Sequence, residues 1–183
     1  MPGAFVVAVR TDDTIRSRAG HSIMAIIGIV AIDRNFAIGK GGTLPWHYSA
    51  DLKFFKQTTV GNVVVMGSRT WHSLKKPLPD RLNIVLTSST ESEPVGSVVR
   101  LPTVEAVLTL ASTLTTDLFI IGGAKVFQTF RPHLDRWIVT EIPLTVDGAD
   151  TFMPADFLEG FELYEVRQLD GELRTKFYER PRS

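Results

Sequence analysis

Four short runs of apolar residues, rich in β-branched side chains, recur along the chain and constrain its fold more than any other feature. The runs cover residues 25–33, 62–67, 83–88 and 118–123. Strands that read as unbroken apolar runs, without regular polar alternation, are typical of a parallel sheet covered on both faces. The sequence therefore predicts a central, largely parallel sheet.

Stretches with a helical pattern separate these runs. Helices are predicted at residues 49–59, about 68–74, 104–112 and 124–130. Later strands are predicted at residues 136–143, 161–168 and 175–180. The last two strands form a predicted hairpin around Asp170 and Gly171. The alternation predicts an α/β fold with antiparallel strands added late, and the clearest long surface loop is predicted at residues 87–97.

A chain of 183 residues favours one domain with a sizeable core. Residues 24–183 are interpreted as that domain, and residues 1–23 as an N-terminal extension that a tag, a linker or a mis-chosen start codon would explain. Lys plus Arg and Asp plus Glu each number 20, so no overall basic field favours nucleic acid or a membrane surface. No apolar run approaches the ~20 residues of a membrane span.

The chain contains no cysteine. Disulfides, thiolate catalysis and cysteine-ligated metal sites are therefore excluded, and a reducing compartment is compatible with the composition. The histidines are His21, His47, His72 and His133. They form no HExxH motif and no close pair on a helical face, so no metal site is predicted.

Two of the predicted strands end in glycine immediately before a predicted helix. "VVVMGSRTW" passes through Gly67, and "FIIGGAKVF" passes through Gly122 and Gly123. A helix N-terminus suits phosphate, and glycine allows close backbone approach, although βα turns also use glycine for geometry alone. Two such junctions in one small sheet suggest a binding site for a dinucleotide. Neither GxGxxG nor the P-loop pattern is present, so an ordinary Rossmann domain or Walker NTPase is not supported.

The segment "IGKGGTLPW" (residues 38–46) leads into the first predicted helix. Its glycines predict a mobile loop, either a surface turn or a lid over a site at the helix start. In that helix Asp51 lies between Phe54 and Phe55 on the apolar face, where a lone carboxylate is costly to bury. The alternative is an acid that the helix dipole favours in the first turn. Arg81 is either a surface arginine or a clamp for a substrate carboxylate.

Taken in chain order, these segments resemble dihydrofolate reductases. The similarity covers about residues 25–180 and runs through "IVAIDRNFAIGKGGTLPWHYSADLKFFKQTT", "VVVMGSRTWHSL", "PLPDRLNIVLTSS", "FIIGGAKVFQTF", "WIVTEI" and "ADTFMP". The resemblance implies a mostly parallel eight-stranded sheet flanked by about four helices, with an antiparallel C-terminal hairpin. It also implies NADPH-dependent reduction of dihydrofolate by a cytoplasmic monomer, with no nucleic-acid or membrane partner.

The resemblance also implies roles for individual residues. Asp51 matches the active-site carboxylate, Thr140 its supporting hydroxyl, Trp46 the tryptophan that helps hold a water, and Leu44 the lid over the nicotinamide. Arg81 matches the arginine that binds the glutamate carboxylate. The other implied substrate-binding residues are Ile29, Ala31, Leu52, Phe55, Leu74, Leu78 and Ile121. Among its neighbours, Phe54 is the expected core residue, whereas Leu52 and Phe55 are expected to form the wall of the substrate site.

A larger set matches the positions that bind the cofactor NADPH. It comprises Val30, Ala31, Ile38, Gly42, Thr43, Gly67, Ser68, Arg69, Thr70, Leu86, Thr87, Ser88, Ile121, Gly122, Gly123, Ala124, Lys125, Val126 and Phe127. Gly122 and Gly123 match a cis peptide of the family. Ser68, Ala124 and Phe127 depart from the usual basic residue, glycine and tyrosine. Arg69, Ser88 and Lys76 are the expected binders of the 2′-phosphate.

The implied reaction is hydride transfer to the pterin C6 with protonation at N5. Asp51 is expected to hold the pterin and to favour protonation electrostatically, while water delivers the proton as the Leu44 loop moves. One alternative is a related pterin or pyrimidine reductase with the same fold. Another is a folate- or nucleotide-binding module that has lost catalysis.

Overall fold

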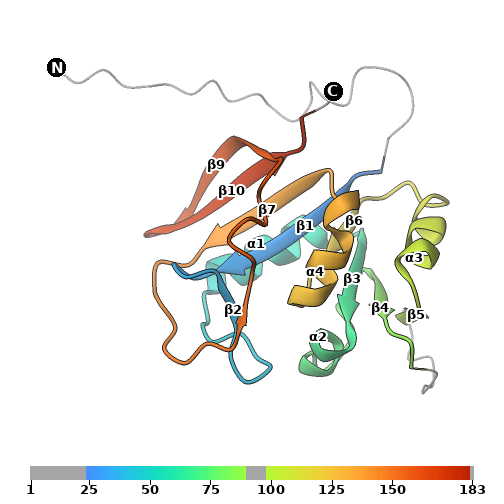
Figure 1. The fold of residues 1–183 in the computed structure, drawn as a ribbon, viewed down its shortest axis with the longest axis horizontal. Helices are drawn as coiled ribbons and strands as arrows, with labels where there is room; N and C mark the ends of the chain where they lie inside the picture. Colours follow the sequence, from blue (N-terminus) through green and yellow to red (C-terminus); the bar gives the residue numbers. More distant parts are fainter. Residues whose placement is uncertain (1–23, 90–97, 182–183) are drawn as a thin grey trace.

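The computed structural model describes residues 24–89 and 98–181 of the chain (Figure 1). The interpretation of residues 1–23 as an extension, and most of the predicted loop at 87–97, therefore fall outside the described residues. No helix in the described ranges is long and apolar enough to cross a membrane.

Within the described residues, one sheet of eight strands forms the centre of the molecule, in the order β5-β4-β3-β6-β1-β7-β10-β9. The strands are β1 (Ile26–Ile32), β3 (Val63–Gly67), β4 (Leu82–Leu86), β5 (Val98–Leu101), β6 (Leu118–Ile120), β7 (Arg136–Glu141), β9 (Glu162–Asp170) and β10 (Leu173–Glu179). All neighbours pair in parallel except β10, which is antiparallel to β7 and to β9. The predicted α/β class, the mostly parallel sheet and the C-terminal hairpin are confirmed.

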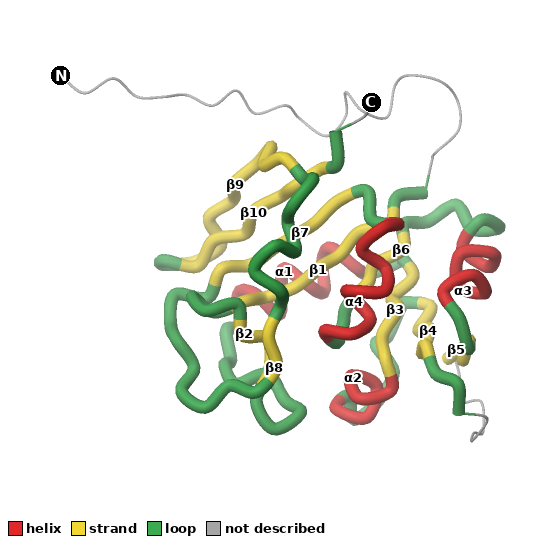
Figure 2. Tube along the Cα trace, in the orientation of Figure 1, coloured by secondary structure: helices red, strands yellow, loops and turns green. Residues whose placement is uncertain are grey.

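Helices cover both faces of this sheet (Figure 2). They are α1 (Ser49–Thr59), α2 (Ser68–Ser73), α3 (Val104–Ala111) and α4 (Ala124–Phe130), followed by the short 3₁₀ helix η2 (Arg131–His133). One core cluster joins α3 and α4 to the sheet, and a second joins α1 to the opposite face. In β1, Val30 belongs to the first cluster and Ile29 to the second. This burial on both faces explains why the strands read as unbroken apolar runs.

The structure contains short strands that the apolar pattern did not predict. Besides β5, these are β2 (Ala37–Gly39) and β8 (Thr151–Phe152), which pair antiparallel in a small second sheet. Each has only two to four residues, too few to establish a recurring pattern. The small sheet matters for function because it joins the segment after β1 to the segment after β7 (Figure 2).

Candidate active site

Helix α1 places Asp51 in its first turn, half-buried on the side that faces the sheet. Phe54 is the core residue of this face, as expected, and its ring packs edge-on against Phe177 of β10 at 6.2 Å. Phe55 is half-buried against the same cluster, whereas Leu52 is 43% exposed. The helix therefore presents the carboxylate between a buried aromatic residue and an apolar, partly open wall.

A hydroxyl on β7 supports this carboxylate. Burial raises the pKa of Asp51 above its ordinary value, and the hydrogen bond from the Thr140 side chain acts in the opposite direction. Thr140 is only 3% exposed and is paired directly with Ala31 in the parallel register of β7 and β1. The predicted combination of Asp51 with Thr140 is thus present in the structure, and it joins α1 to the centre of the sheet.

The predicted substrate wall lies on the α1 face of the sheet. Ile29 belongs to the α1-side core cluster, and the half-buried members packed against it include Phe55, Leu74, Leu78 and Ile121. Arg81 lies at the edge of this wall, and its guanidinium carbon is 5.8 Å from the centroid of the Phe55 ring. These side chains form an apolar surface with one cation at its margin, which suits a flat ring carrying an anionic tail.

Arg81 is unusually buried for an arginine, at 6% exposure. Burial lowers the pKa of Arg81, and the charge of Asp80 opposes this effect. Among the described residues, no group accepts a hydrogen bond from its Nε. Asn83, a fully buried residue that the sequence analysis missed, holds the turn in place by donating to the carbonyls of Leu78 and Arg81. Arg81 is therefore a buried arginine, not a surface one.

Trp46 lies between the glycine-rich segment and α1, and it is half-buried. Its indole Nε1 is inaccessible to solvent and has no hydrogen-bond partner within the described residues. A buried indole N–H without an acceptor is costly. This orphaned donor fits the expected role of Trp46 in binding a water molecule.

The two glycine junctions lie side by side at the carboxyl ends of neighbouring strands. The backbone N–H of Gly67 after β3 donates to the carbonyl of Gly122 after β6, at 2.8 Å, and the peptide bond between Gly122 and Gly123 is cis as expected. A Cβ on Gly67 would approach Val126 to 2.9 Å, and Gly122 adopts a φ of 109°. Both positions therefore require glycine, and together they form a backbone surface that a phosphate chain can approach closely.

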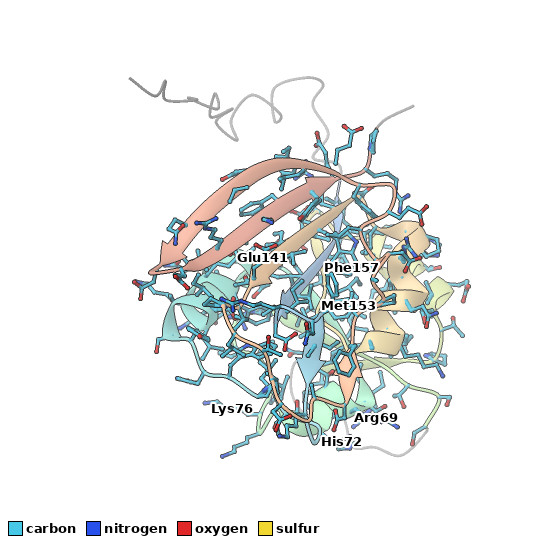
Figure 3. The ribbon with its side chains drawn as sticks, turned by 60° about the vertical axis from the view of Figure 1, so that its left-hand side comes forward. Arg69, His72, Lys76, Glu141, Met153 and Phe157 are labelled. Atoms are coloured by element: carbon cyan, nitrogen blue, oxygen red, sulfur yellow. The ribbon has the colours of Figure 1, made fainter. Side chains whose placement is uncertain are left out.

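The remaining cofactor positions surround this surface. Leu86, Thr87 and Ser88 lie at the carboxyl end of β4, next to β3, while Thr70 lies within 3.7 Å of a Cβ placed on Gly123. The side chains of Arg69 and Lys125 are exposed. Arg69, His72 and Lys76 lie at the same end of the molecule in Figure 3. Ligands of open α/β sheets bind beyond the carboxyl ends of the strands, and these residues occupy that location.

Not every predicted cofactor residue is accessible. Val126 and Phe127 are 7% and 3% exposed, and Phe127 packs against Trp137 with its ring centroid at 5.4 Å. Val30 belongs to the same core cluster, on the α3 and α4 side of the sheet. These residues support the glycine junctions from within the core, whereas Ser68, Ala124 and Ile121 are half-buried beside them.

The predicted glycine-rich lid contains a tight turn. Lys40 and Thr43 exchange backbone hydrogen bonds of 3.0 and 3.1 Å, and Gly41 and Gly42 between them have φ values of 58° and 77°. Positive φ at both central positions is the type I′ arrangement that glycine favours. Leu44 follows and is 53% exposed, and Ile38 lies in β2. The glycine-rich segment thus forms a hairpin turn in this structure.

The segment after β7 holds this turn in place. Asp150 accepts a hydrogen bond from the backbone N–H of Gly41 at 2.6 Å, and Lys40 Nζ donates to the carbonyl of Asp147 at 2.6 Å. The Gly41 N–H and the Thr151 hydroxyl keep the pKa of Asp150 below its ordinary value. Asp150 was not predicted from the sequence, because nothing in its immediate neighbours reveals a partner that lies 109 residues away.

Asp33 holds the base of the same region together. This carboxylate is 3% exposed and accepts backbone hydrogen bonds from Asn35, Ala37 and Val146, each at 2.8 Å. Burial alone would raise the pKa of Asp33, but these three donors together lower it below its ordinary value. Asp33 therefore remains ionised and joins the start of the lid segment to the loop after β7.

The glycine junctions and Thr140 extend along the carboxyl edge of the sheet from β3 to β7, while Arg81 precedes the amino end of β4. At one end are the joined glycine junctions, and at the other are Asp51, Thr140 and an apolar wall. The arrangement can hold an elongated phosphorylated ligand beside a flat ring whose edge meets a carboxylate. Such a site suits transfer between two rings that are bound face to face.

A family model described as dihydrofolate reductase matches residues 25–179. The dihydrofolate reductase of Bacillus subtilis (strain 168) is 39% identical over 128 residues, which cover 70% of this chain and 75% of that protein. The dihydrofolate reductase of Haemophilus influenzae is 36% identical over 149 residues, covering 80% of this chain and 90% of that protein. A solved structure of dihydrofolate reductase from Enterococcus faecalis, complexed with NADP(H) and RAB-propyl, matches with a TM-score of 0.79 and 34% identity, over 85% of this chain and 96% of that one.

Proposed function

This chain belongs to the dihydrofolate reductase family, and from that premise we propose how its own residues carry the reaction. The protein is an enzyme that uses NADPH to reduce 7,8-dihydrofolate to 5,6,7,8-tetrahydrofolate. The observation that carries the residue assignments is the placement of Asp51. This half-buried carboxylate is supported by Thr140 on the same sheet edge as the paired glycine junctions.

Asp51 binds the edge of the pterin ring in this proposal. The carboxylate accepts hydrogen bonds from ring N–H groups, while Ile29, Phe55 and Leu52 contact the apolar faces of the substrate. Arg81 binds the glutamate carboxylate, for which its buried position and unpartnered Nε are the support. A guanidinium matches a carboxylate in geometry as well as in charge.

The reduction adds a hydride ion to C6 of the pterin and a proton to N5. Bound NADPH supplies the hydride. The negative charge of Asp51 stabilises the pterin ring in its N5-protonated form, and the low-polarity surroundings strengthen this effect. The proton itself comes from water that reaches N5 as the Leu44 segment moves, with Trp46 Nε1 as the donor that orients such a water.

The residues present fit the cofactor that the family uses. Gly67, Gly122 and Gly123 present bare backbone that the diphosphate approaches in this proposal. A Cβ on Gly67 or Gly122 would also press against Val126 or Phe127 of α4. Thr70 and Lys125 add a hydroxyl and a cation beside that surface. Arg69, Ser88 and Lys76 hold the 2′-phosphate in this proposal, in place of the usual basic residue at Ser68. In this proposal the nicotinamide ring of the cofactor is covered by Gly42, Thr43 and Leu44.

We further propose that the enzyme acts as a monomer in the cytoplasm. Every residue assigned to the site comes from one chain, so the site does not need a second copy. The fold uses no disulfide, which is compatible with a reducing compartment.

This function is tested by mixing the protein with NADPH and dihydrofolate and monitoring NADPH oxidation through the nicotinamide absorbance. The assignment of Arg81 is tested by Arg81→Gln, which should raise the KM for dihydrofolate by about 10- to 100-fold. The same variant should change the KM little for a dihydropterin without the aminobenzoylglutamate tail. NADPH binding without oxidation would indicate a binding module, and equal effects on both substrates would contradict the role of Arg81.

A further inference from the structure

A second buried hydroxyl lies behind Asp51 and Thr140. Thr175 of β10 is paired directly with Thr140 of β7 in the antiparallel register, so both side chains project from the same face of the sheet. Their Oγ1 atoms are 3.1 Å apart, and Thr175 has no exposed surface. Three elements, α1, β7 and β10, thus contribute to one hydrogen-bonded series that ends at the substrate site.

The direction of these hydrogen bonds follows from the number of protons available. Each hydroxyl has one proton to donate, and an ionised carboxylate only accepts. The 3.1 Å contact between the two threonines allows either donor, and with Thr140 donating to ionised Asp51 its oxygen accepts and Thr175 is the donor. Within the described part of the chain, the Thr175 hydroxyl has no other hydrogen-bond partner. The series therefore runs from Thr175 to Thr140 to Asp51.

We propose that Thr175 is a positioning residue for the reaction: its hydroxyl fixes the Thr140 hydroxyl in the orientation that donates to ionised Asp51. This inference rests on the proposed function, because that function makes Asp51 the carboxylate that binds the pterin. A hydroxyl that accepts one hydrogen bond also donates a stronger one, so Thr175 acts on Asp51 without touching it. Without Thr175, the Thr140 hydroxyl is free to rotate away from the carboxylate.

The charged side chains near this series are paired with each other or turned away. Glu141 and Lys176 follow Thr140 and Thr175 along their strands, so they project from the opposite face, where they bind each other at 2.6 Å. On β9, Arg167 lies over the ring of Phe177 and binds Glu165 at 2.7 Å. Two further titratable groups on these elements are half-buried, Arg136 of β7 and Tyr178 of β10. The remaining ones are exposed: Lys53, Lys56, Glu162, Tyr164, Asp170, Arg174 and Glu179.

The proposal is tested by titrating the Asp51 carboxyl in the free protein and monitoring that side chain by carbon NMR. Thr175→Val keeps the branched shape and removes the hydroxyl. Thr140 then stabilises the carboxylate less, so the pKa of Asp51 should rise by about 0.3 unit. Thr140→Val should raise the pKa further, and Thr175→Ser should restore the wild-type titration. The pH profile of hydride transfer should shift in the same order.

Thr59 provides a matched control. It is also fully buried, and its hydroxyl donates to the Phe55 carbonyl within α1 at 2.8 Å. Thr59→Val should therefore leave the Asp51 titration unchanged. An unchanged titration in folded Thr175→Val, or in Thr175→Ala if valine prevents folding, would overturn the proposal. Failure of the wild-type protein to oxidise NADPH with dihydrofolate would contradict the proposed function. The titration needs no turnover, so it tests the role of Thr175 separately from that function.

Discussion

At the scale of single residues, the site depends on two carboxylates with opposite environments. Asp51 has few donors and its pKa is raised by burial, whereas Asp33 is 3% exposed and its pKa is lowered by three backbone N–H groups. Three backbone donors outweigh the effect of burial at Asp33, and the Thr140 hydrogen bond does not outweigh it at Asp51. Asp51 keeps lone pairs available for a ligand, and Asp33 uses its lone pairs to hold the backbone.

Asp51→Asn should raise the free energy of unfolding at neutral pH while it slows the reaction. The native state binds the Asp51 proton more tightly than the unfolded chain, so ionised Asp51 destabilises the fold above its folded-state pKa. Below the ordinary carboxyl pKa of about 4 both forms are neutral, and the difference from wild type should vanish. Denaturant unfolding across pH measures this, and an Asn variant less stable than wild type at neutral pH would contradict it.

The sequence was sufficient to find Asp51 but not Thr175. An acid on an apolar helical face is visible in the local pattern, because the helical period places Phe54 and Phe55 beside it. Thr175 is revealed only by the register between β7 and β10, which local patterns do not determine. Asp150 was missed for the same kind of reason, since the Gly41 N–H that it binds lies 109 residues away. Asn83 binds carbonyls only two and five residues away, but the turn that brings them to its side chain is not visible in the apolar pattern.

At the scale of elements, the segment after β1 and the segment after β7 behave as one unit. The β2 and β8 pairing, the Gly41 contact with Asp150 and the Asp33 carboxylate all join these two parts of the chain. Strands β1, β3, β4 and β6 were predictable from runs of β-branched residues, and the helices from their period. Strands β2 and β8 were not, because they are short and pair with each other across a long stretch of chain. Strand β5 has only four residues, one of them an arginine, and so lacks an apolar run.

Asp33→Asn should destabilise the protein by about 2 kcal/mol at neutral pH. The amide keeps one acceptor oxygen but places an NH₂ group against the Val146 or the Ala37 N–H. Because the folded-state pKa of Asp33 is lowered, its stabilisation is present above the ordinary carboxyl pKa and is lost as pH falls through the folded value. The difference between the variant and wild type should therefore shrink in acid, which chemical denaturation at several pH values measures.

Asp135→Asn is the matched control for this change. Asp135 also accepts a backbone hydrogen bond, from Ile26 at 2.8 Å, but at the opposite end of β1. Both variants should lose stability, whereas only Asp33→Asn should lower kcat, because only Asp33 holds the base of the lid segment. Equal kcat values for the two variants would show that Asp33 is merely structural.

At the scale of the whole molecule, the start of the first strand, β1, is held by hydrogen bonds from within the described fold. The backbone N–H groups of Ala25 and Ile26 donate to Asp117 and Asp135, so the start of β1 has its partners within the described residues. A chain that begins at Met24 should therefore fold with a Tm within about 2 °C of the full chain and with unchanged kcat. Calorimetry and the NADPH assay check this, and a large loss of either would show that residues 1–23 contribute to the domain.

The proposed mechanism of reduction depends most on the action of Asp51 on the bound pterin. Single-turnover hydride transfer from NADPH to dihydrofolate should be slower in Asp51→Asn by about 10²- to 10³-fold near neutral pH, with the variant folded and NADPH still bound. The wild-type rate should also depend on the ionisation of a carboxyl with a raised pKa, and that dependence should disappear in the variant. Hydride transfer by Asp51→Asn at a rate close to wild type would contradict the account.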